Sequence, residues 1–277
     1  MAEFQDKELV VGRMRLHYLD WGAEGKQTVL LLHGGSQSAH SWDEFSRAMR
    51  HDYHVIALDQ RGHGDSDWSK YGIYTLRAHL RDIGGFIKAL DLSKIVLVGL
   101  SMGGRNSIAY AATHPERIDR LVIVDIAPET MKKGIENIRR FARRADILPS
   151  REAFVERAHQ FNPRRPIEQL RERLTWHLRQ LPDGRWTWKY DRRFRNRRSA
   201  ETGRDDLWGY VRRIKAPTLI VRGAESDILS PTAAKRLHKA IPGSSLVVIE
   251  KAGHTVAGDN PPAFAAAVRS FLRSTGR

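Results

Sequence analysis

Short apolar runs alternate along the chain with amphipathic stretches. The runs are rich in Val, Ile and Leu, and glycine or polar turn residues follow each of them. An uninterrupted apolar run of this kind predicts a strand buried on both faces, as in a parallel sheet. The runs lie at 28–32, 53–58, 95–98, 121–124, 219–222 and 245–249.

The stretches between these runs have a helical period. Within 76–90 the apolar residues recur every three or four positions, which places them on one helix face. Further helices are expected at 42–49, 105–113, 232–240 and 262–272, and a hairpin of two strands at 8–11 and 14–21. Strands that alternate with helices predict βαβ units, and therefore an α/β protein with a mostly parallel sheet.

The alternation stops after Pro128. Helices are predicted at 132–145, 151–161 and 167–181, and no further strand until the run that follows Pro217. We therefore expect two parts: a core formed by 1–127 and 213–277, and a helical cap, 128–212, inserted over the carboxyl ends of the strands. Four of the chain's seven tryptophans lie in this cap, at Trp176, Trp186, Trp188 and Trp208.

Positive charge is concentrated in the cap. The whole chain has a formal net charge of +15, and from Ala127 to Arg212 there are 22 Lys and Arg against 12 Asp and Glu. A solvated helical surface is the favoured interpretation, and attraction of anionic substrates is the alternative. No nucleic-acid-binding motif accompanies the charge, so no nucleic-acid partner is expected. The tryptophans favour apolar recognition of a neutral substrate.

Composition excludes several classes of protein. No apolar run approaches the ~20 residues that span a bilayer, and the N-terminus lacks the pattern of a secretion signal. The sequence has no cysteine, which excludes disulfides and a thiol nucleophile. A cytoplasmic location is expected.

The sequence Gly99-Leu100-Ser101-Met102-Gly103 joins the apolar run at 95–98 to a predicted helix. Small residues on both sides of a serine permit a sharp turn from strand to helix, which exposes the hydroxyl at the carboxyl end of the sheet. Ser101 is therefore the candidate nucleophile. The turn also directs the backbone N–H of Met102 toward the atom that Ser101 attacks.

A serine needs a base, and the base needs a carboxylate to orient it. His254 follows the last predicted strand in a loop that contains Gly253, and we expect it to be the base. Asp227 and Asp125 each follow a strand and compete for the role of the acid. Both fit the order Ser, Asp, His that is typical of serine hydrolases on a parallel sheet, and Asp227 is preferred. Asp125 is then expected to anchor the start of the cap, and Glu225 is a third, weaker candidate.

The oxyanion of acyl transfer needs two backbone donors. Met102 is one candidate, and Gly35, in the loop after the run at 28–32, is the other, with Ser36 as its alternative. His33 is expected to brace that loop by hydrogen bonding. A second polar loop carries Asp59, Arg61, His63 and Asp65, which we interpret as a network that stabilises the loop.

Together these motifs resemble those of the α/β-hydrolase superfamily. The residues that carry the resemblance are His33-Gly34-Gly35, the stretch 59–66, Gly99–Gly104, Asp227 and Gly253-His254. The resemblance covers nearly all of the chain outside the cap. It implies an eight-stranded sheet, the triad Ser101, Asp227 and His254, and no cofactor or metal. A serine nucleophile argues against the family's haloalkane dehalogenases and epoxide hydrolases, which use aspartate there.

The expected function is that of a cap-bearing serine hydrolase. It would cleave carboxylic esters of small to medium size through an acyl-enzyme on Ser101. Lactonase, C–C bond hydrolase and cofactor-free perhydrolase activities use the same site and remain open. A non-catalytic ligand receptor on this fold is a further alternative. The sequence leaves the acyl group, the alcohol and the oligomeric state undetermined.

Overall fold

A computed structural model describes residues 3–142, 144–163, 165–195 and 206–274. Its centre is an eight-stranded sheet in the order β1-β2-β4-β3-β5-β6-β10-β11. β1 pairs antiparallel with β2 and β2 with β4, and all other neighbours are parallel. The mostly parallel sheet of the α/β prediction is confirmed. The strands are Gln5–Val11, Met14–Asp20, Thr28–Leu32 (β3), His54–Leu58 (β4), Ile95–Leu100 (β5), Ile118–Val124 (β6), Thr218–Gly223 (β10) and Ser245–Ile249 (β11).

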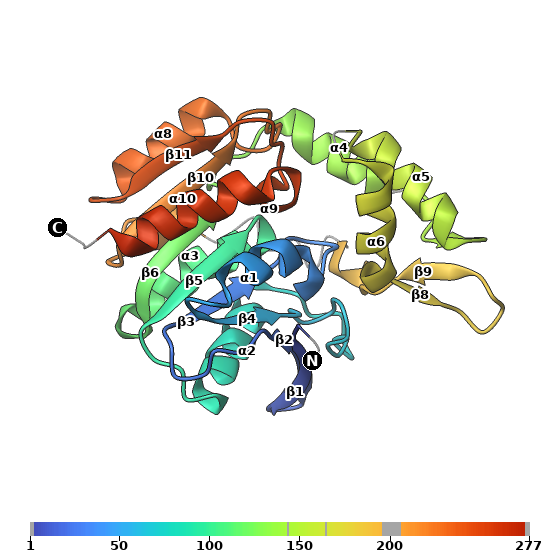
Figure 1. Ribbon diagram of the computed structural model, residues 1–277, viewed down its shortest axis with the longest axis horizontal. Coiled ribbons are helices and arrows are strands. Elements are labelled where there is room, and N and C mark those ends of the chain that lie inside the picture. Colours follow the sequence, from blue (N-terminus) through green and yellow to red (C-terminus); the bar gives the residue numbers. More distant parts are fainter. Residues whose placement is uncertain (1–2, 143, 164, 196–205, 275–277) are drawn as a thin grey trace.

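Helices cover both faces of this sheet (Figure 1). Successive strand residues point to opposite faces, so that Leu30 and Leu32 belong to one hydrophobic cluster and Val29 and Leu31 to another. The first cluster includes residues of α2 (Leu76–Ala89), α3 (Met102–Thr113), α7 (Leu207–Val211) and α8 (Pro231–Ala240). The second includes residues of α1 (Asp43–Met49), α9 (Val256–Asp259) and α10 (Pro261–Arg273). Short 3₁₀ helices lie at Ala39–Trp42 and Pro115–Arg117.

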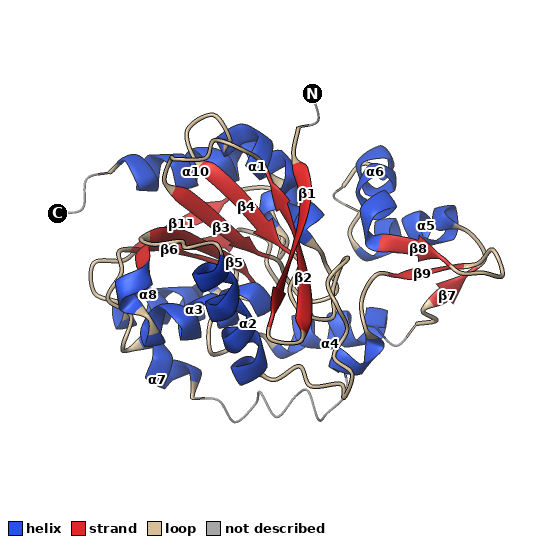
Figure 2. Cartoon of the chain, turned by 90° about the horizontal axis from the view of Figure 1, so that it is seen from below, coloured by secondary structure: helices blue, strands red, loops and turns tan. Residues whose placement is uncertain are grey.

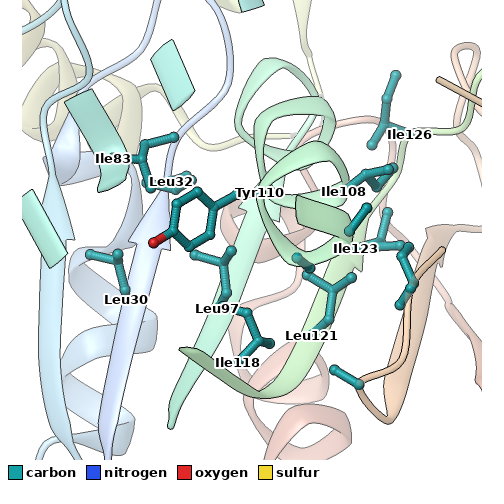
Figure 3. Packing of buried hydrophobic residues seen from close by; sticks show 14 of the residues in the cluster. Leu30, Leu32, Ile83, Leu97, Ile108, Tyr110, Ile118, Leu121, Ile123 and Ile126 are labelled. Atoms are coloured by element: carbon teal, nitrogen blue, oxygen red, sulfur yellow. The ribbon is translucent and has the colours of Figure 1, made fainter. Parts of the chain in front are cut away.

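Helix α3 packs directly on the central strands. Figure 3 shows the Tyr110 ring of this helix among Leu30 and Leu32 of β3 and Leu97 of β5. These side chains are buried, with Leu30 and Leu97 at 0% exposure and Tyr110 at 2%. The helix that follows the candidate nucleophile therefore has a rigid base.

The cap is less helical than predicted. It contains α4 (Lys132–Ala142), α5 (Arg151–Phe161) and α6 (Ile167–His177), but also a three-stranded antiparallel sheet, which lies apart from the main sheet in Figure 2. Its strands are β7 (Ile147–Leu148), β8 (Leu178–Gln180) and β9 (Trp186–Trp188), and a 3₁₀ helix follows at Arg192–Arg195. The expected helix at 167–181 ends at His177 because Leu178 pairs with Trp188 across a turn that Gly184 closes at φ +84°.

The end of the cap was also placed too late in the sequence. α7 lies within the predicted cap, yet Leu207 and Val211 are buried in the core cluster that contains α3. Trp208 packs against the same cluster, and the guanidinium of Arg236 stacks over its ring at 4.7 Å. α7 is therefore part of the core, and the structure describes the cap up to Arg195.

The cap has a small hydrophobic cluster of its own. Phe154, Leu170, Leu174 and Trp188 form this cluster, which is separate from both core clusters. Described contacts between the cap and the core include several polar ones. The backbone N–H of Asp191 donates to the carbonyl of Gly62 at 2.8 Å, and the Tyr74 hydroxyl donates to the Asp191 carboxylate at 2.5 Å. Lys189 and Asp65 form an ion pair at 2.7 Å. Within the described ranges, no helix has the length and apolar character needed to cross a bilayer.

Candidate active site

Ser101 lies at the sharp turn between β5 and α3. Its backbone adopts φ 53° and ψ −112°, which is sparsely populated for a residue with a side chain. The glycines beside it are required by close packing. A Cβ on Gly103 would lie 2.1 Å from the carbonyl oxygen of Leu32, and one on Gly99 would lie 2.5 Å from that of Gly103. The strand–turn–helix geometry expected for Ser101 is therefore present.

Asp125 and His254 meet at the same edge of the sheet. His254 Nδ1 lies 2.8 Å from Asp125 Oδ2, and the Asp125 side chain is fully buried. β5 and β6 are neighbouring strands, so the carbonyl of Val124, at the end of β6, accepts the backbone N–H of Ser101 at 3.2 Å. Asp125 is the next residue after Val124. The structure thus brings a carboxylate, an imidazole and a serine hydroxyl to the same edge of the sheet.

The carboxylate of Asp125 accepts two further hydrogen bonds. The backbone N–H of Gly223 donates to Oδ1 at 3.0 Å, and the Ser226 hydroxyl donates to Oδ2 at 2.5 Å. The N–H groups of Ile228 and Leu229 occupy the acceptor side of the Ser226 oxygen, so its proton points toward Asp125. These donors hold the Asp125 carboxylate in one orientation toward His254.

These contacts favour Asp125 over Asp227, the acid that the sequence analysis preferred. Asp227 accepts a hydrogen bond from Asn137 Nδ2 of the cap helix α4 at 2.9 Å. Ser226, the residue before Asp227 in the same loop, is the one that contacts Asp125. Asp125, which was expected to anchor the cap, contacts the imidazole, and Asp227, which was expected to be the acid, contacts the cap.

Ser101 and His254 are not hydrogen-bonded in the resting structure. Both are partly exposed at the sheet edge, but the described contacts of the Ser101 hydroxyl do not include His254. Bonds between a nucleophile and its base are often long in unliganded enzymes and tighten when substrate binds. The Nε2 of His254 is the nitrogen left for Ser101, because Nδ1 faces Asp125.

The two expected oxyanion donors lie on either side of Ser101. Met102 is the first residue of α3, and the loop that carries Gly35 approaches the serine so closely that a Cβ on Gly34 would lie 3.5 Å from Ser101 Cβ. Within the described chain, neither the Met102 N–H nor the Gly35 N–H donates to a protein acceptor. Both donors thus remain candidates. Phe194 of the cap covers Gly35, with its ring 3.4 Å from where a Cβ would stand.

His33 braces the loop before Gly35, as expected. Its Nδ1 donates to the carbonyl of Gly34 at 2.7 Å, and its Nε2 accepts the N–H of Gln60 at 3.0 Å. Gln60 in turn donates to the His33 carbonyl and accepts from Asn106 of α3. Complete burial lowers the pKa of His33, so the ring stays neutral and keeps this tautomer.

The polar loop at 59–66 is a structural network. Asp59 accepts the N–H of Ala39 at 2.6 Å and that of Asp65 at 2.9 Å, and it also contacts His17, which the sequence analysis did not identify. Arg61 forms a buried ion pair with Asp82 at 2.5 Å. His17, Asp59 and Asp65 form a group whose ligand atoms could surround a metal ion. Each of these carboxylates already has hydrogen-bonding or cationic partners, which favours the structural role.

His63 lies beneath the cap. Its Nδ1 donates to the carbonyl of Arg61 at 3.0 Å, while its Nε2 is buried without a partner. Burial lowers the pKa of His63 to about 3, so the ring is neutral at physiological pH. The Phe194 ring lies 4.8 Å away, between centroids.

Asp259 connects the His254 loop to the cap and was missed by the sequence analysis. Its carboxylate accepts the N–H of Gly253 at 3.0 Å and the hydroxyl of Thr255 at 3.0 Å, on either side of His254. The same carboxylate binds the guanidinium of Arg165 at 2.8 Å and the side-chain amide of Asn162 at 3.1 Å, both from the cap. The backbone on both sides of the candidate base is thus held by an acid that the cap also contacts.

A cavity of about 680 Å³ opens beside His254. Its core side carries Glu225, Asp227, Gly253, Thr255 and Asp259, and its cap side carries residues of α4 and of the α5–α6 connection. None of the four cap tryptophans lines it: Trp188 is in the cap cluster, Trp208 is in the core, and Trp176 stacks on His40 at 4.2 Å. The expectation of a tryptophan-lined apolar pocket is therefore not met in this cavity.

The chain belongs to the α/β-hydrolase family. The model of the alpha/beta hydrolase fold matches residues 27–261, and the fold and strand-end site described above agree with it. The protein is therefore a hydrolase with a small-molecule substrate, as the sequence predicted.

Two relatives and one solved structure illustrate its place in that family. The chain is 29% identical over 263 residues to esterase Rv0045c of Mycobacterium tuberculosis, covering 92% of this chain and 85% of the relative. It is 29% identical over 295 residues to a 2-hydroxy-6-oxononadienedioate/2-hydroxy-6-oxononatrienedioate hydrolase of Escherichia coli, covering 98% and 95%. The crystal structure of E-2-(acetamidomethylene)succinate hydrolase superposes with a TM-score of 0.87 at 26% identity, covering 98% of this chain and all of the other.

Proposed function

We propose that this protein hydrolyses carboxylic esters through an acyl-enzyme on Ser101. His254 is the base, Asp125 orients it, and the N–H groups of Gly35 and Met102 bind the oxyanion. The contact between His254 Nδ1 and Asp125 Oδ2, at 2.8 Å and at the strand ends beside Ser101, is the observation that supports this assignment most strongly.

The reaction proceeds in two halves. His254 Nε2 takes the proton of Ser101 as the oxygen attacks the ester carbonyl, and the negative charge that develops on the carbonyl oxygen is stabilised by the two amides. The alcohol then leaves with the proton from His254. Water, deprotonated by the same nitrogen, attacks the acyl-enzyme and releases the acid and Ser101. Asp125 stabilises the imidazolium in both halves and is not itself protonated.

The ester substrate is favoured by the relative from Mycobacterium tuberculosis, whose name is that of an esterase. Opening of a lactone, cleavage of a C–C bond beside a carbonyl and perhydrolysis begin with the same groups, since fold and triad do not select among them. A panel of p-nitrophenyl esters of increasing acyl length, measured beside several lactones, tests the proposal. Turnover of esters that is lost in Ser101→Ala supports it, and activity on lactones alone contradicts the ester assignment.

A non-catalytic receptor is the alternative from a different class. Such a protein would bind ligands in the cavity beside His254 without turnover. Labelling of Ser101 by a fluorophosphonate, together with no hydrolysis of any ester in the panel, would favour the receptor. Rapid labelling with ester turnover would exclude it. The cytoplasmic location and the absence of a nucleic-acid partner remain predictions from composition and charge.

A further inference from the structure

One face of helix α4 forms the cap side of the cavity. Lys133, Asn137, Arg140 and Phe141 line it, and Arg144, just beyond the helix, extends the series. Residues at this spacing share one helix face, so three cations of the cap are directed at the cavity. These three side chains are exposed to solvent, as expected for the cap, and they also line the cavity.

These cations have no carboxylate partner. Within the described residues, no acid lies within 4 Å of Lys133, Arg140 or Arg144, and Arg144 contacts only the neutral Gln160, at 3.4 Å. Like charges on one helix face repel each other, which costs stability unless an anion lies among them.

Three acids of the cap form ion pairs away from this cavity. Glu152 pairs with Arg171 at 2.6 Å, Asp183 with Arg185 at 2.6 Å, and Asp146 with Arg195 at 2.7 Å. The helix face toward His254 thus carries positive charge that these neighbouring acids do not neutralise.

The opposite side of the cavity is acidic. Asp227 lies there beside His254 and contacts the neutral amide of Asn137, while Asp259 is paired with Arg165. A negatively charged group is therefore repelled from the end where His254 acts and attracted to the α4 end. This polarity fixes which way round an anionic substrate lies.

We propose that the substrate carries a carboxylate, which binds Arg140, Arg144 and Lys133 while its ester carbonyl lies at Ser101. This inference rests on the proposed ester hydrolysis and names its substrate class. The volume of about 680 Å³ is that of an ordinary small-molecule site. The three side chains are exposed to solvent, so their attraction for the substrate must weaken as salt is added.

A matched pair of esters tests the inference. One is p-nitrophenyl hydrogen adipate, and the other is the neutral ester in which an isopropyl group replaces the carboxylate. At low salt, kcat/KM should favour the carboxylate ester by about tenfold, as expected for a charge-assisted contact, and the preference should shrink as salt rises. Equal kcat/KM values for the two esters, or a preference that salt leaves unchanged, would overturn the inference.

Variants of the two arginines test whether these side chains cause the preference for the carboxylate ester. Arg140→Gln and Arg144→Gln should each lower kcat/KM for the carboxylate ester several-fold, by about the amount of one charge-assisted contact, and leave the neutral ester within about twofold. Arg171→Gln is the matched control, because it removes a cap guanidinium that is paired with Glu152 away from the cavity. Loss of the preference in the control, or equal losses for both esters, would contradict the assignment.

Failure of the proposed function can be distinguished from failure of this inference. If the neutral ester is cleaved through Ser101 with no preference for the carboxylate, ester hydrolysis stands and the inference falls. If neither ester is cleaved, binding of adipate to Ser101→Ala is measured by calorimetry. Binding that Arg140→Gln weakens and salt reverses supports the anion site, and no binding overturns it.

Discussion

The hydroxyl of Ser226 lies 2.5 Å from Asp125 Oδ2, the same oxygen that contacts His254 Nδ1. Ser226 follows β10, in the loop from which the sequence analysis drew its preferred acid. The loop therefore contributes a hydrogen-bond donor to Asp125, the acid that we propose, which follows β6.

Replacement of Ser101 tests the nucleophile. Ser101→Ala should reduce ester turnover by several powers of ten, because the covalent intermediate cannot form. The hydroxyl makes no described hydrogen bond that supports the fold, so the thermal midpoint should be unchanged. Turnover like that of the unmodified protein, in a folded Ser101→Ala sample, would refute the proposed mechanism.

The two aspartates are distinguished by amide substitutions. Asp125→Asn should lower kcat by on the order of 10⁴, because an amide at this position favours the wrong tautomer of His254. Asp227→Asn should change kcat by less than about tenfold, since Asp227 contacts Asn137 of the cap and not the imidazole. Steady-state kinetics of both variants on one ester decides the matter. A larger loss at Asp227 would restore the assignment that the sequence favoured.

The cap contact with Asp259 should affect both stability and catalysis. In Arg165→Gln the Asp259 carboxylate, 1% exposed, loses its cationic partner, which costs about 3 kcal/mol of unfolding free energy. The hydrogen bonds from Gly253 and Thr255 to Asp259 should then weaken, which leaves His254, the residue between them, less well positioned. We therefore expect kcat to fall more than KM rises. Chemical denaturation and steady-state kinetics measure the two effects.

Two further variants separate geometry from charge at this contact. Gly258→Ala keeps every charge but puts a Cβ 2.1 Å from a guanidinium nitrogen of Arg165, so it should cause the same changes to a smaller degree. Arg171→Gln, in an exposed cap pair, should change neither quantity. Destabilised Arg165→Gln protein with an unchanged kcat would show that the contact supports the fold alone.

Buried histidines should make the fold sensitive to mild acid. Burial lowers the pKa of His63 and of His177 to about 3, and it also lowers the pKa of His33. For His63 and His177 the stabilising effect is complete above the unfolded pKa of about 6.5 and is lost as the pH falls toward 3, at about 1 kcal/mol per pH unit for each ring. His33 acts in the same direction. His17 opposes this trend, because its bond with Asp59 raises its pKa.

Thermal unfolding between pH 7.5 and pH 5 checks the direction of this effect. The melting temperature should fall over that interval, above the range in which carboxylates such as Asp59, whose pKa is lowered, become protonated. His177→Asn should reduce the slope. A melting temperature that is constant or rises toward pH 5 would contradict neutral burial of these rings.

Local patterns predicted most of the core. Uninterrupted apolar runs identify buried strands, and the turn around Ser101 is determined by the residues beside it, so neither depends on distant partners. His254 was found because its position after the last strand places it at the active edge. Asp125 was ranked below Asp227 because the choice depends on which strands are neighbours, and the pairing of β5 with β6 puts Asp125 near Ser101.

The features that the sequence analysis missed all depend on contacts between residues that are far apart in the sequence. β9 is three residues long, too short for an alternation to be recognised, and it exists because it pairs with β7 and β8. Arg165 and Asp259 are separated by 94 residues, and each alone resembles a solvated surface charge. Lys133, Arg140 and Arg144 looked like part of such a surface until the orientation of α4 placed them on the cavity.

The separate hydrophobic cluster of the cap has a consequence for how the molecule opens. Phe154, Leu170 and Trp188 pack against one another within the cap, whereas Ile135 of α4 packs against a core cluster, so opening of the cap would expose Ile135 but keep the cap cluster intact. Polar contacts such as the Arg165–Asp259 pair would break in that event. Amide hydrogen exchange should therefore resolve two cooperative units, with cap amides exchanging through a partial opening of lower free energy than global unfolding.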